Sequence, residues 1–524
     1  MPLTLTRRQL LAGLAALPAL TPAAEAAAPD LPLPPLVDLE KTGGIAAFTA
    51  QKATHQFSPG GPASESYGYS ASFLGPVFKV RAGTDMKVQF RNALDVETAV
   101  HWHGLLIPSA VDGGPHNPVA PGGTWEPTLP IRQQACTAWY HPHPHGDTAR
   151  QVYMGLAGLI YIEDDASAAL NLPAAYGVND FPLVLQDRDF DDQGVMVYDT
   201  SPMAVMHGAR GAQVIVNGAL QPQAQVAKGL NRLRLLNGAN ARNFQLRFAD
   251  GRSFAVIASD GGLLEKPVTV ATLVIAPGER YEILVDFADG KPAALQTFPD
   301  YNGDFGTGTI SALKDRLAAM THEAETILTF APVKPAPAAK LPASLASLPA
   351  ANAAEAVQTR RFLLNPMNMM NMPMMEAAGQ GGMANMNHSG MMMQGMMKGM
   401  KMAMPGMDMS GLGMGMKMAI NDKSFDMARI DAEPKLGSSE LWELSGEAMA
   451  HPFHIHGVQF RVLELDGAAP PEEQRGWKDT VLVNQKTRLL VRFTQTATAE
   501  KPFMFHCHIL EHEDAGMMAQ YRTV

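Results

Sequence analysis

One supersecondary pattern occurs three times along the chain and limits the fold more than any other feature. The passages VRAGTDMKVQFRNAL from Val80, VAKGLNRLRLLNGAN from Val226 and PKLGSSELWELSGEA from Pro434 each contain a turn, an alternating strand and a break. A second short strand follows each of them: AVHWHGLLI, ARNFQLRF and AHPFHIHGVQF. Period-two runs bounded by Gly, Pro and Asn are typical of antiparallel sheets. The repeat therefore predicts three copies of one β-sandwich domain.

The length of the chain agrees with three such domains. A single hydrophobic core stops growing near roughly 250 to 300 residues, and this chain has 524. We predict an all-β fold of three Greek-key β-sandwich domains, with a methionine-rich insertion in the third. The predicted boundaries are residues 29–168, 169–335 and 357–524, with a linker at 336–356. The linker is rich in Pro and Ala, so we expect it to run along the outside of the molecule.

The N-terminal residues predict export rather than a part of the fold. Arg7 and Arg8 precede a short apolar run and then small residues, a pattern typical of a twin-arginine leader over residues 1–28. A plain amphipathic helix is the alternative. The run is shorter than the roughly 20 residues that a membrane span requires, so we expect a periplasmic protein without a membrane span. The formal charge of -10 argues against a nucleic-acid partner, and we expect a monomer.

Histidines gather in four short motifs, which lie in the first and third copies of the repeat. Residues i and i+2 of a strand point to the same face, so each motif directs one pair of imidazoles to one side. Eight imidazoles are enough to bind several metal ions. The pairs are His101 with His103, His141 with His143, His454 with His456, and His506 with His508. The matching strand of the second copy, ARNFQLRF, carries no histidine, so we expect the centre where the first and last domains meet.

Cys507 lies between two of these histidines but points to the opposite face of its strand. It therefore binds a different ion, and His451, His512 and Met517 are the neighbouring soft donors. Two imidazoles, one thiolate and a weak thioether form the electron-transfer site of blue copper proteins, whereas zinc prefers a tetrahedral site without the long axial sulfur. The segment HCH then joins the two sites through a few backbone bonds. Electrons collected one at a time would pass to the histidines, with dioxygen as the natural acceptor.

The chain contains only one other cysteine, Cys136. A single disulfide between the two cysteines is the alternative for an exported protein. The metal-site setting of Cys507 favours instead a Cys136 that is buried and inert.

The four histidine motifs, in this order and spacing, resemble those of the multicopper oxidase family over essentially the whole mature chain. The resemblance implies three cupredoxin-like domains and four copper ions. It assigns His101 and His454 to the type 2 copper. It assigns the type 3 pair to His103, His141, His143, His456, His506 and His508, and the type 1 copper to His451, Cys507, His512 and Met517.

The resemblance also implies acids that supply protons for oxygen reduction. Asp112 in AVDGGP and Glu513 in LEHED resemble the acids with this role in relatives, and turn and surface positions are the alternatives. His116 and His145 are interpreted as bystanders or as groups that support the ligands.

A methionine-rich segment at 367–418 contains 21 of the 33 methionines. Gly, Asn and Pro interrupt any helical period, which predicts an insertion of low complexity without a fixed structure. Thioethers select cuprous copper over hard cations, and His388 is a further candidate ligand. The segment makes the chain similar to the bacterial copper-efflux oxidases, which implies a substrate copper near His451 held by Glu447 and Met449. Those relatives carry a methionine and an acid near Leu364 and Asn368, and the stretch LLNPMNMMN of this chain departs from that pattern.

The combined pattern predicts a periplasmic oxidase that couples one-electron oxidation of Cu(I) to four-electron reduction of dioxygen, for copper tolerance. A laccase-type oxidase of phenols is the main alternative. A copper storage or delivery protein would explain the methionines but not the eight imidazoles. A nitrite reductase of cupredoxin type would need only a single copper beyond the thiolate site.

Overall fold

The computed structural model describes residues 28–298, 300, 324–335, 339–366 and 417–524. The described residues form six sheets and only short helices. The predicted leader lies outside the described residues except for its last position. The same is true of the methionine-rich segment, of which only Lys417 and Met418 are described.

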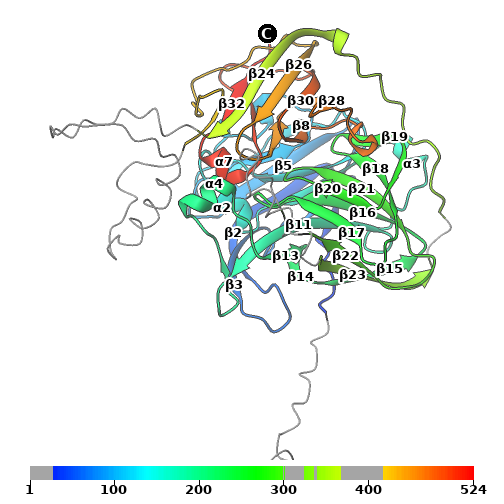
Figure 1. The fold of residues 1–524 in the computed structure, drawn as a ribbon. Coiled ribbons are helices and arrows are strands. Elements are labelled where there is room, and N and C mark those ends of the chain that lie inside the picture. Colours follow the sequence, from blue (N-terminus) through cyan, green and yellow to red (C-terminus); the bar gives the residue numbers. More distant parts are fainter. Residues whose placement is uncertain (1–27, 299, 301–323, 336–338, 367–416) are drawn as a thin grey trace, which may run out of the picture.

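The first sandwich is formed by two sheets with the strand orders β1-β4-β10-β9-β6 and β3-β2-β5-β7, with β8 also paired to β5 (Figure 1). Phe48 of one sheet packs on Phe78 of the other, with ring centroids 5.5 Å apart. The strands are β1 (Leu36–Asp38), β2 (Ile45–His55), β3 (Ser64–Tyr69), β4 (Val77–Arg81), β5 (Asp85–Asn92), β6 (Val100–His103), β7 (Thr124–Trp125), β8 (Thr128–Pro130), β9 (Cys136–Pro142) and β10 (Gly158–Glu163).

The second sandwich pairs an eight-stranded sheet, β14-β13-β11-β16-β21-β18-β19 with β12 on β11, with the sheet β15-β23-β22-β17-β20. Its core is aliphatic and aromatic, and includes Leu235 and Phe330. The strands are β11 (Asp180–Phe190), β12 (Met196–Val197), β13 (Gln213–Val216), β14 (Ala219–Leu220), β15 (Gln223–Lys228), β16 (Leu230–Asn237), β17 (Phe244–Phe248), β18 (Phe254–Ser259), β19 (Gly262–Val270), β20 (Thr272–Ile275), β21 (Arg280–Asp286), β22 (Ala293–Thr297) and β23 (Glu325–Pro335).

The third sandwich has the sheets β25-β24-β26-β30-β28 and β29-β27-β31-β32. Trp442 and Phe362 of the first sheet pack on Phe505 of the second, with ring centroids 5.2 Å and 4.9 Å from it. The strands are β24 (Ala356–Pro366), β25 (Met418–Ile420), β26 (Ser439–Gly446), β27 (His451–Ile455), β28 (Gln459–Leu465), β29 (Thr480–Val483), β30 (Thr487–Arg492), β31 (Phe503–Cys507) and β32 (Met518–Tyr521).

The repeated sequence pattern corresponds to one structural unit. Its two strands are β5 and β6 in the first sandwich, β16 and β17 in the second, and β26 and β27 in the third. In each copy the chain crosses from one sheet to the other between the two strands. The predicted all-β fold of three cupredoxin-like domains is therefore confirmed, while the exact domain boundaries stay predictions.

The helices are short and lie mostly between strands: α2 (Thr148–Tyr153), α3 (Asp165–Ala168), α4 (Pro202–His207), α7 (Leu510–Asp514) and the 3-10 turns η1 (Ser109–Val111), η2 (Ala353–Glu355) and η5 (Glu472–Gln474). Three of them, α2, α4 and α7, come from different sandwiches and gather at one place (Figure 1). None of the helices in the described ranges is long and apolar enough to cross a membrane.

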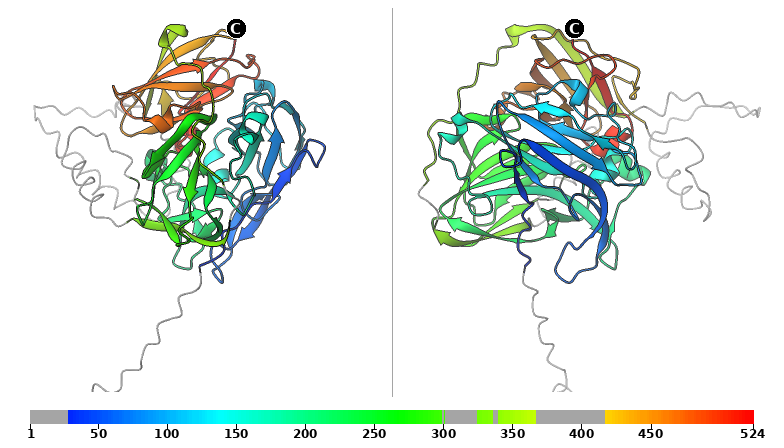
Figure 2. Two further views of the ribbon diagram at one scale, coloured as in Figure 1. Left: turned by 90° about the vertical axis from the view of Figure 1, so that its right-hand side faces the viewer. Right: turned by 180° about the vertical axis from the view of Figure 1, so that it is seen from behind.

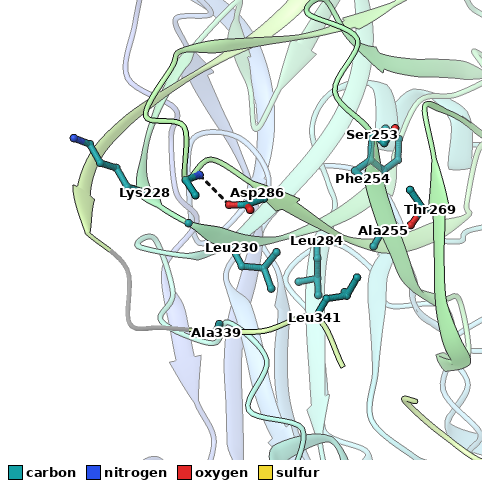
Figure 3. A pocket seen from close by; sticks show the side chains of 12 residues that line it. Lys228, Leu230, Ser253, Phe254, Ala255, Thr269, Leu284, Asp286, Ala339 and Leu341 are labelled. Carbon is teal, nitrogen blue, oxygen red and sulfur yellow. Dashed lines mark hydrogen bonds between the residues drawn. The ribbon is translucent and has the colours of Figure 1, made fainter. Parts of the chain in front are cut away.

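The described part of the linker lies on the second and third sandwiches, as Figures 1 and 2 show. The Leu345 N–H donates to the carbonyl of Glu265 at 2.9 Å, and Arg461 donates to the carbonyl of Pro349 at 3.0 Å. Ala339 and Leu341 of the linker form one wall of a pocket against the second sandwich (Figure 3). The residues that line this pocket include no predicted site residue.

Candidate metal centre

The eight paired histidines meet where the first and third sandwiches face each other. We call them the imidazole cluster: His101, His103, His141, His143, His454, His456, His506 and His508. Strand pairing places His101 beside His141 and His454 beside His506. Between the two domains, the rings of His101 and His456 stack at 3.7 Å and those of His103 and His454 at 3.6 Å. All eight side chains are at most 1% exposed.

The nitrogen atoms of the cluster have the arrangement that metal ions require. Several sets of three rings place ligand atoms within 4.8 Å of one another, among them His101 with His454 and His456, and His143 with His456 and His506. Burial lowers the pKa of His143 and of His508 to about 3, so these rings are neutral donors. A buried polar atom without a partner is costly. The atoms without a hydrogen bond include His101 Nε2, His103 Nδ1, His141 Nε2, His454 Nε2 and both ring nitrogens of His508.

Several of the other ring nitrogens are fixed by backbone carbonyls. The Nδ1 atoms of His101, His454 and His506 donate to the carbonyls of Asp112, Asp479 and Cys507 at 3.1, 2.9 and 2.9 Å. Such bonds select the tautomer and direct the other nitrogen, Nε2, towards the centre. His103 has the opposite orientation, because its Nε2 lies 3.0 Å from Asp479 Oδ1 and 3.1 Å from Thr480 Oγ1.

Both predicted acids contact the cluster. Asp112 Oδ2 lies 2.7 Å from His456 Nδ1 and 3.4 Å from His101 Nδ1. Glu513 lies 3.3 Å from His143 Nδ1 and 3.1 Å from His506 Nδ1. Burial opposes ionisation of Glu513, yet the facing His143 and His506 hold its pKa below the ordinary value. Both acids are at most 3% exposed, so a surface position is excluded for each.

The two bystander histidines lie outside the cluster. His116 Nε2 is 2.9 Å from Gln520 Oε1, and the ring of His145 packs edge-on against Phe425 at 5.4 Å.

The sequence did not reveal the contribution of the second sandwich. Arg280, at the start of β21, donates to both carboxylate oxygens of Asp479 at 2.7 and 2.6 Å, and Asp479 in turn contacts His103. Both groups are about 1% exposed. The only signal in the sequence is the charged pair Lys478 and Asp479, directly before a strand. Because this pair lies at a distance along the chain from the histidine motifs, its role was not evident.

A second site lies within the third sandwich. We call His451, Cys507, His512 and Met517 the thiolate site. Cys507 Sγ is 3.5 Å from His451 Nδ1 and 3.7 Å from His512 Nδ1, and all three residues are buried. The backbone of Met517 is hydrogen-bonded to two other residues of the site. Its N–H donates to the carbonyl of His512 at 2.8 Å, and its carbonyl accepts the N–H of Cys507 at 3.0 Å. Two imidazoles and a thiolate with a methionine beside them fit a copper ion.

Neither cysteine forms a disulfide, so the alternative of a single bridge is wrong. Cys136 is buried in the first sandwich and accepts a weak hydrogen bond from Gln133 Nε2 at 3.4 Å. Burial raises the pKa of the Cys136 thiol to about 12, which keeps it protonated and unreactive. This agrees with an inert Cys136.

Each of the two histidines of the thiolate site has its second ring nitrogen, Nε2, next to a backbone carbonyl. His451 Nε2 lies 3.1 Å from the carbonyl of Glu447, and His512 Nε2 lies 3.1 Å from the carbonyl of Met206 in α4. Of the predicted substrate residues, Glu447 is exposed and Met449 is only 7% exposed. Asn368 lies outside the described residues, and Leu364 accepts the Glu447 N–H at 3.0 Å. The sequence did not single out Met206.

Three comparisons with known proteins agree with this geometry. Residues 50–167, 171–314 and 387–524 each match a family model described as multicopper oxidase. The chain belongs to the multicopper oxidase family. It is therefore an oxidoreductase with copper as its cofactor.

The chain also matches individual proteins along most of its length. It is 36% identical over 490 residues to the cell division protein FtsP of Edwardsiella tarda, covering 94% of this chain and 92% of the relative. Among solved structures, the laccase-like multicopper oxidase CueO of Ochrobactrum sp., described as acting on lignin model compounds and lignosulfonate, has a TM-score of 0.79 at 41% identity, covering 94% and 100%. The multicopper oxidase of Campylobacter jejuni, described as a metallo-oxidase, has a TM-score of 0.73 at 27% identity, covering 94% and 96%.

Proposed function

We propose that this protein is a periplasmic cuprous oxidase, which oxidises Cu(I) at the thiolate site and reduces dioxygen to water at the imidazole cluster. The observation that carries the proposal is the segment His506–Cys507–His508. Its cysteine belongs to one site and its two histidines belong to the other. An electron accepted at Cys507 therefore has only a few covalent bonds to cross before it reaches the cluster.

The donor sets support four copper ions. His101 and His454 would hold a type 2 ion, and His451, Cys507, His512 and Met517 a type 1 ion. A type 3 pair would be held by His103, His141, His143, His456, His506 and His508. When bound, the copper ions supply one-electron transfer and the binding of dioxygen.

Asp112 and Glu513 are placed to move protons to the site of oxygen reduction. Each carboxylate contacts two histidines of the cluster and lies between 2.7 and 3.4 Å from their Nδ1 atoms. A carboxylate at this distance can pass a proton inward and be protonated again from the solvent side.

Cuprous copper is the preferred donor because the chain supplies so many thioethers. Soft sulfur ligands select Cu(I), and 21 methionines lie between 367 and 418. The likeness to a metallo-oxidase of Campylobacter jejuni also supports a metal ion as the substrate. Export by the twin-arginine leader would place this activity in the periplasm, where it would serve copper tolerance.

The decisive experiment compares oxygen consumption with a Cu(I) complex and with a phenol. Cu(I) also reacts with oxygen unaided, so the rate of the Cys507→Ser variant is subtracted as the matched background. We expect a higher kcat/KM for Cu(I) than for 2,6-dimethoxyphenol. The reverse order would identify a laccase, the second candidate, which the likeness to a lignin-active relative favours.

A role in cell division is a third candidate, because the chain is similar to FtsP. The proposal predicts that loss of the gene makes cells sensitive to copper and that Cys507→Ser fails to restore tolerance. If cells without the gene divide abnormally and the Cys507→Ser variant restores normal division, the protein has a role that does not depend on electron transfer.

A further inference from the structure

Helix α4 of the second sandwich exposes two methionines beside the thiolate site. Ser201 caps the helix, with its Oγ accepting the Ala204 N–H at 3.2 Å. Ala204 faces inward and is 7% exposed, whereas Met203 is 59% and Met206 40% exposed. Exposed thioethers are open to oxidation, and they can also meet a soft metal ion from solution.

The same helix contacts a predicted copper ligand. The Nε2–H of His512 donates to the carbonyl of Met206 at 3.1 Å, while the other ring nitrogen, Nδ1, faces Cys507 Sγ at 3.7 Å. One imidazole thus separates the backbone of Met206 from the thiolate. Figure 1 shows α4 directly beside α7, which carries His512.

Glu511 fixes α4 in this position. Its carboxylate accepts a hydrogen bond from the hydroxyl of Tyr198 at 2.9 Å, before the helix, and from the N–H of Ala209 at 3.0 Å, after it. Gly208, with φ 77, ends the helix so close to its neighbours that an added Cβ would lie 2.7 Å from Ile509 Cγ2. The segment is therefore held on the loop that carries the thiolate site.

The side chains at this place suit one class of ligand. Met203, Met206 and His207 occupy positions i, i+3 and i+4, which share one face of a helical turn. His207 is exposed as well. Two thioethers and an imidazole form a soft donor set that selects Cu(I) over hard cations.

We propose that Met203, Met206 and His207 bind substrate Cu(I), and that its electron enters the thiolate site through His512. This set does not include Glu447, whose carbonyl lies 3.1 Å from His451 Nε2, or Met449. The identity of the donor rests on the proposed function. Each Cu(I) gives up one electron and leaves as Cu(II). Four such ions and four protons reduce one dioxygen to two waters.

The binding site can be tested without turnover. Ag(I) mimics Cu(I) but transfers no electron, and the full-length, copper-loaded protein would be treated with hydrogen peroxide in chloride-free buffer, with and without Ag(I). Peptide mass spectrometry then measures oxidation of each methionine, which makes the result independent of the segment 367–418. Met427, which is 37% exposed, is the internal control. We expect Ag(I) to protect Met203 and Met206 together but not Met427. Equal oxidation with and without Ag(I) at the two positions would overturn the site.

The role of this site in Cu(I) oxidation is tested by kinetics. The double variant Met203→Leu/Met206→Leu keeps the size and apolar character of both side chains but removes the sulfur atoms. We expect KM for Cu(I) to rise about tenfold with kcat unchanged, since binding alone is lost. His207→Gln should change KM in the same direction, and Met427→Leu should leave it unchanged. An unaltered KM in the double variant would overturn the role of this site in Cu(I) oxidation. If the wild type does not oxidise Cu(I), the proposed function fails, and the Ag(I) protection still decides whether the site exists.

Discussion

The imidazole cluster takes its histidines from two domains, whereas every ligand of the thiolate site lies within the third sandwich. The cluster exists only when the first and third domains are docked, because its stacked ring pairs, such as His101 on His456, cross the boundary. The thiolate site depends instead on the start of β27, which carries His451, and on the end of β31 with the short segment after it, from Cys507 to Met517. The two sites should therefore respond differently to changes in ligands, in domain contacts and at the surface.

The second sandwich supports both sites but donates no ligand atom among its described residues. Its Arg280 pairs with Asp479 of the third sandwich beside the cluster, and its α4 segment is bonded to Glu511 of the third sandwich beside the thiolate site. Its copy of the second repeat strand, ARNFQLRF, carries no histidine, and the sandwich supplies buried charge and surface cover instead.

The largest effect is expected from Cys507→Ser. Only the thiolate gives the strong blue absorption, so that band and turnover should both be lost. Copper should stay bound at the imidazole cluster, since none of its ligands changes. Absorption spectroscopy with copper analysis measures both properties, and a variant that keeps its blue colour would refute the assignment of the thiolate site.

Loss of the acids should slow oxygen reduction at the imidazole cluster without affecting reduction of the thiolate site. Glu513→Gln and Asp112→Asn should each lower the rate of oxygen reduction by about 10²-fold, the usual contribution of a positioned proton donor. Anaerobic bleaching of the blue band by Cu(I) should proceed at the wild-type rate. Stopped-flow absorption follows both steps.

Asp514→Asn is the matched control for the acids. Asp514 is next in the chain to Glu513, but it accepts the N–H groups of Thr148 and Ala149 at 2.9 Å. An asparagine keeps an acceptor for one of these two bonds, so some stability should be lost while oxygen reduction changes little. Normal steady-state rates in both acid variants would rule out the proton role.

A third change addresses the support from the second sandwich. Arg280→Leu leaves the buried carboxylate of Asp479 without its cation, and breaking such a pair costs about 3–5 kcal/mol. We expect less copper in the imidazole cluster and a lower melting temperature, while the blue band is retained. Copper content and the magnetic resonance signal of the type 2 ion measure the loss.

Arg234→Leu is the matched control for this variant. Arg234 is equally buried and pairs with Asp180 at 2.8 Å and with Glu282, and neither acid touches a cluster histidine. This variant should lose stability but keep its copper. Equal copper loss in both would show that general destabilisation, rather than the contact with His103, explains the first result.

The smallest change is expected from deleting residues 367–416. The flanking strands β24 and β25 lie next to the His451 edge, where Leu364 accepts the Glu447 N–H. Loss of the thioethers should lower Cu(I) oxidation several-fold at limiting copper, and phenol oxidation should rise. Oxygen uptake with each donor measures the change. Unaltered Cu(I) oxidation at limiting copper would show that the segment has no part in recruiting the substrate.

Much of this arrangement could be predicted because it is encoded locally. The repeated turn and strand define the three sandwiches, and the i, i+2 spacing of histidines fixes which rings share a face. The same rule separates Cys507 from His506 and His508 and so predicts two sites on one strand. Asp112 and Glu513 could be predicted because they lie close in sequence to ligand motifs and resemble the acids of relatives.

The sequence by itself determined the fold class, the donor atoms and their division between two sites, because strand periodicity acts over a few residues. Only the tertiary structure decided which distant groups meet these donors. Arg280 and Asp479 are 199 positions apart, and His512 and Met206 are 306 positions apart. Their contacts follow from how three whole sandwiches pack, and no local pattern encodes that packing.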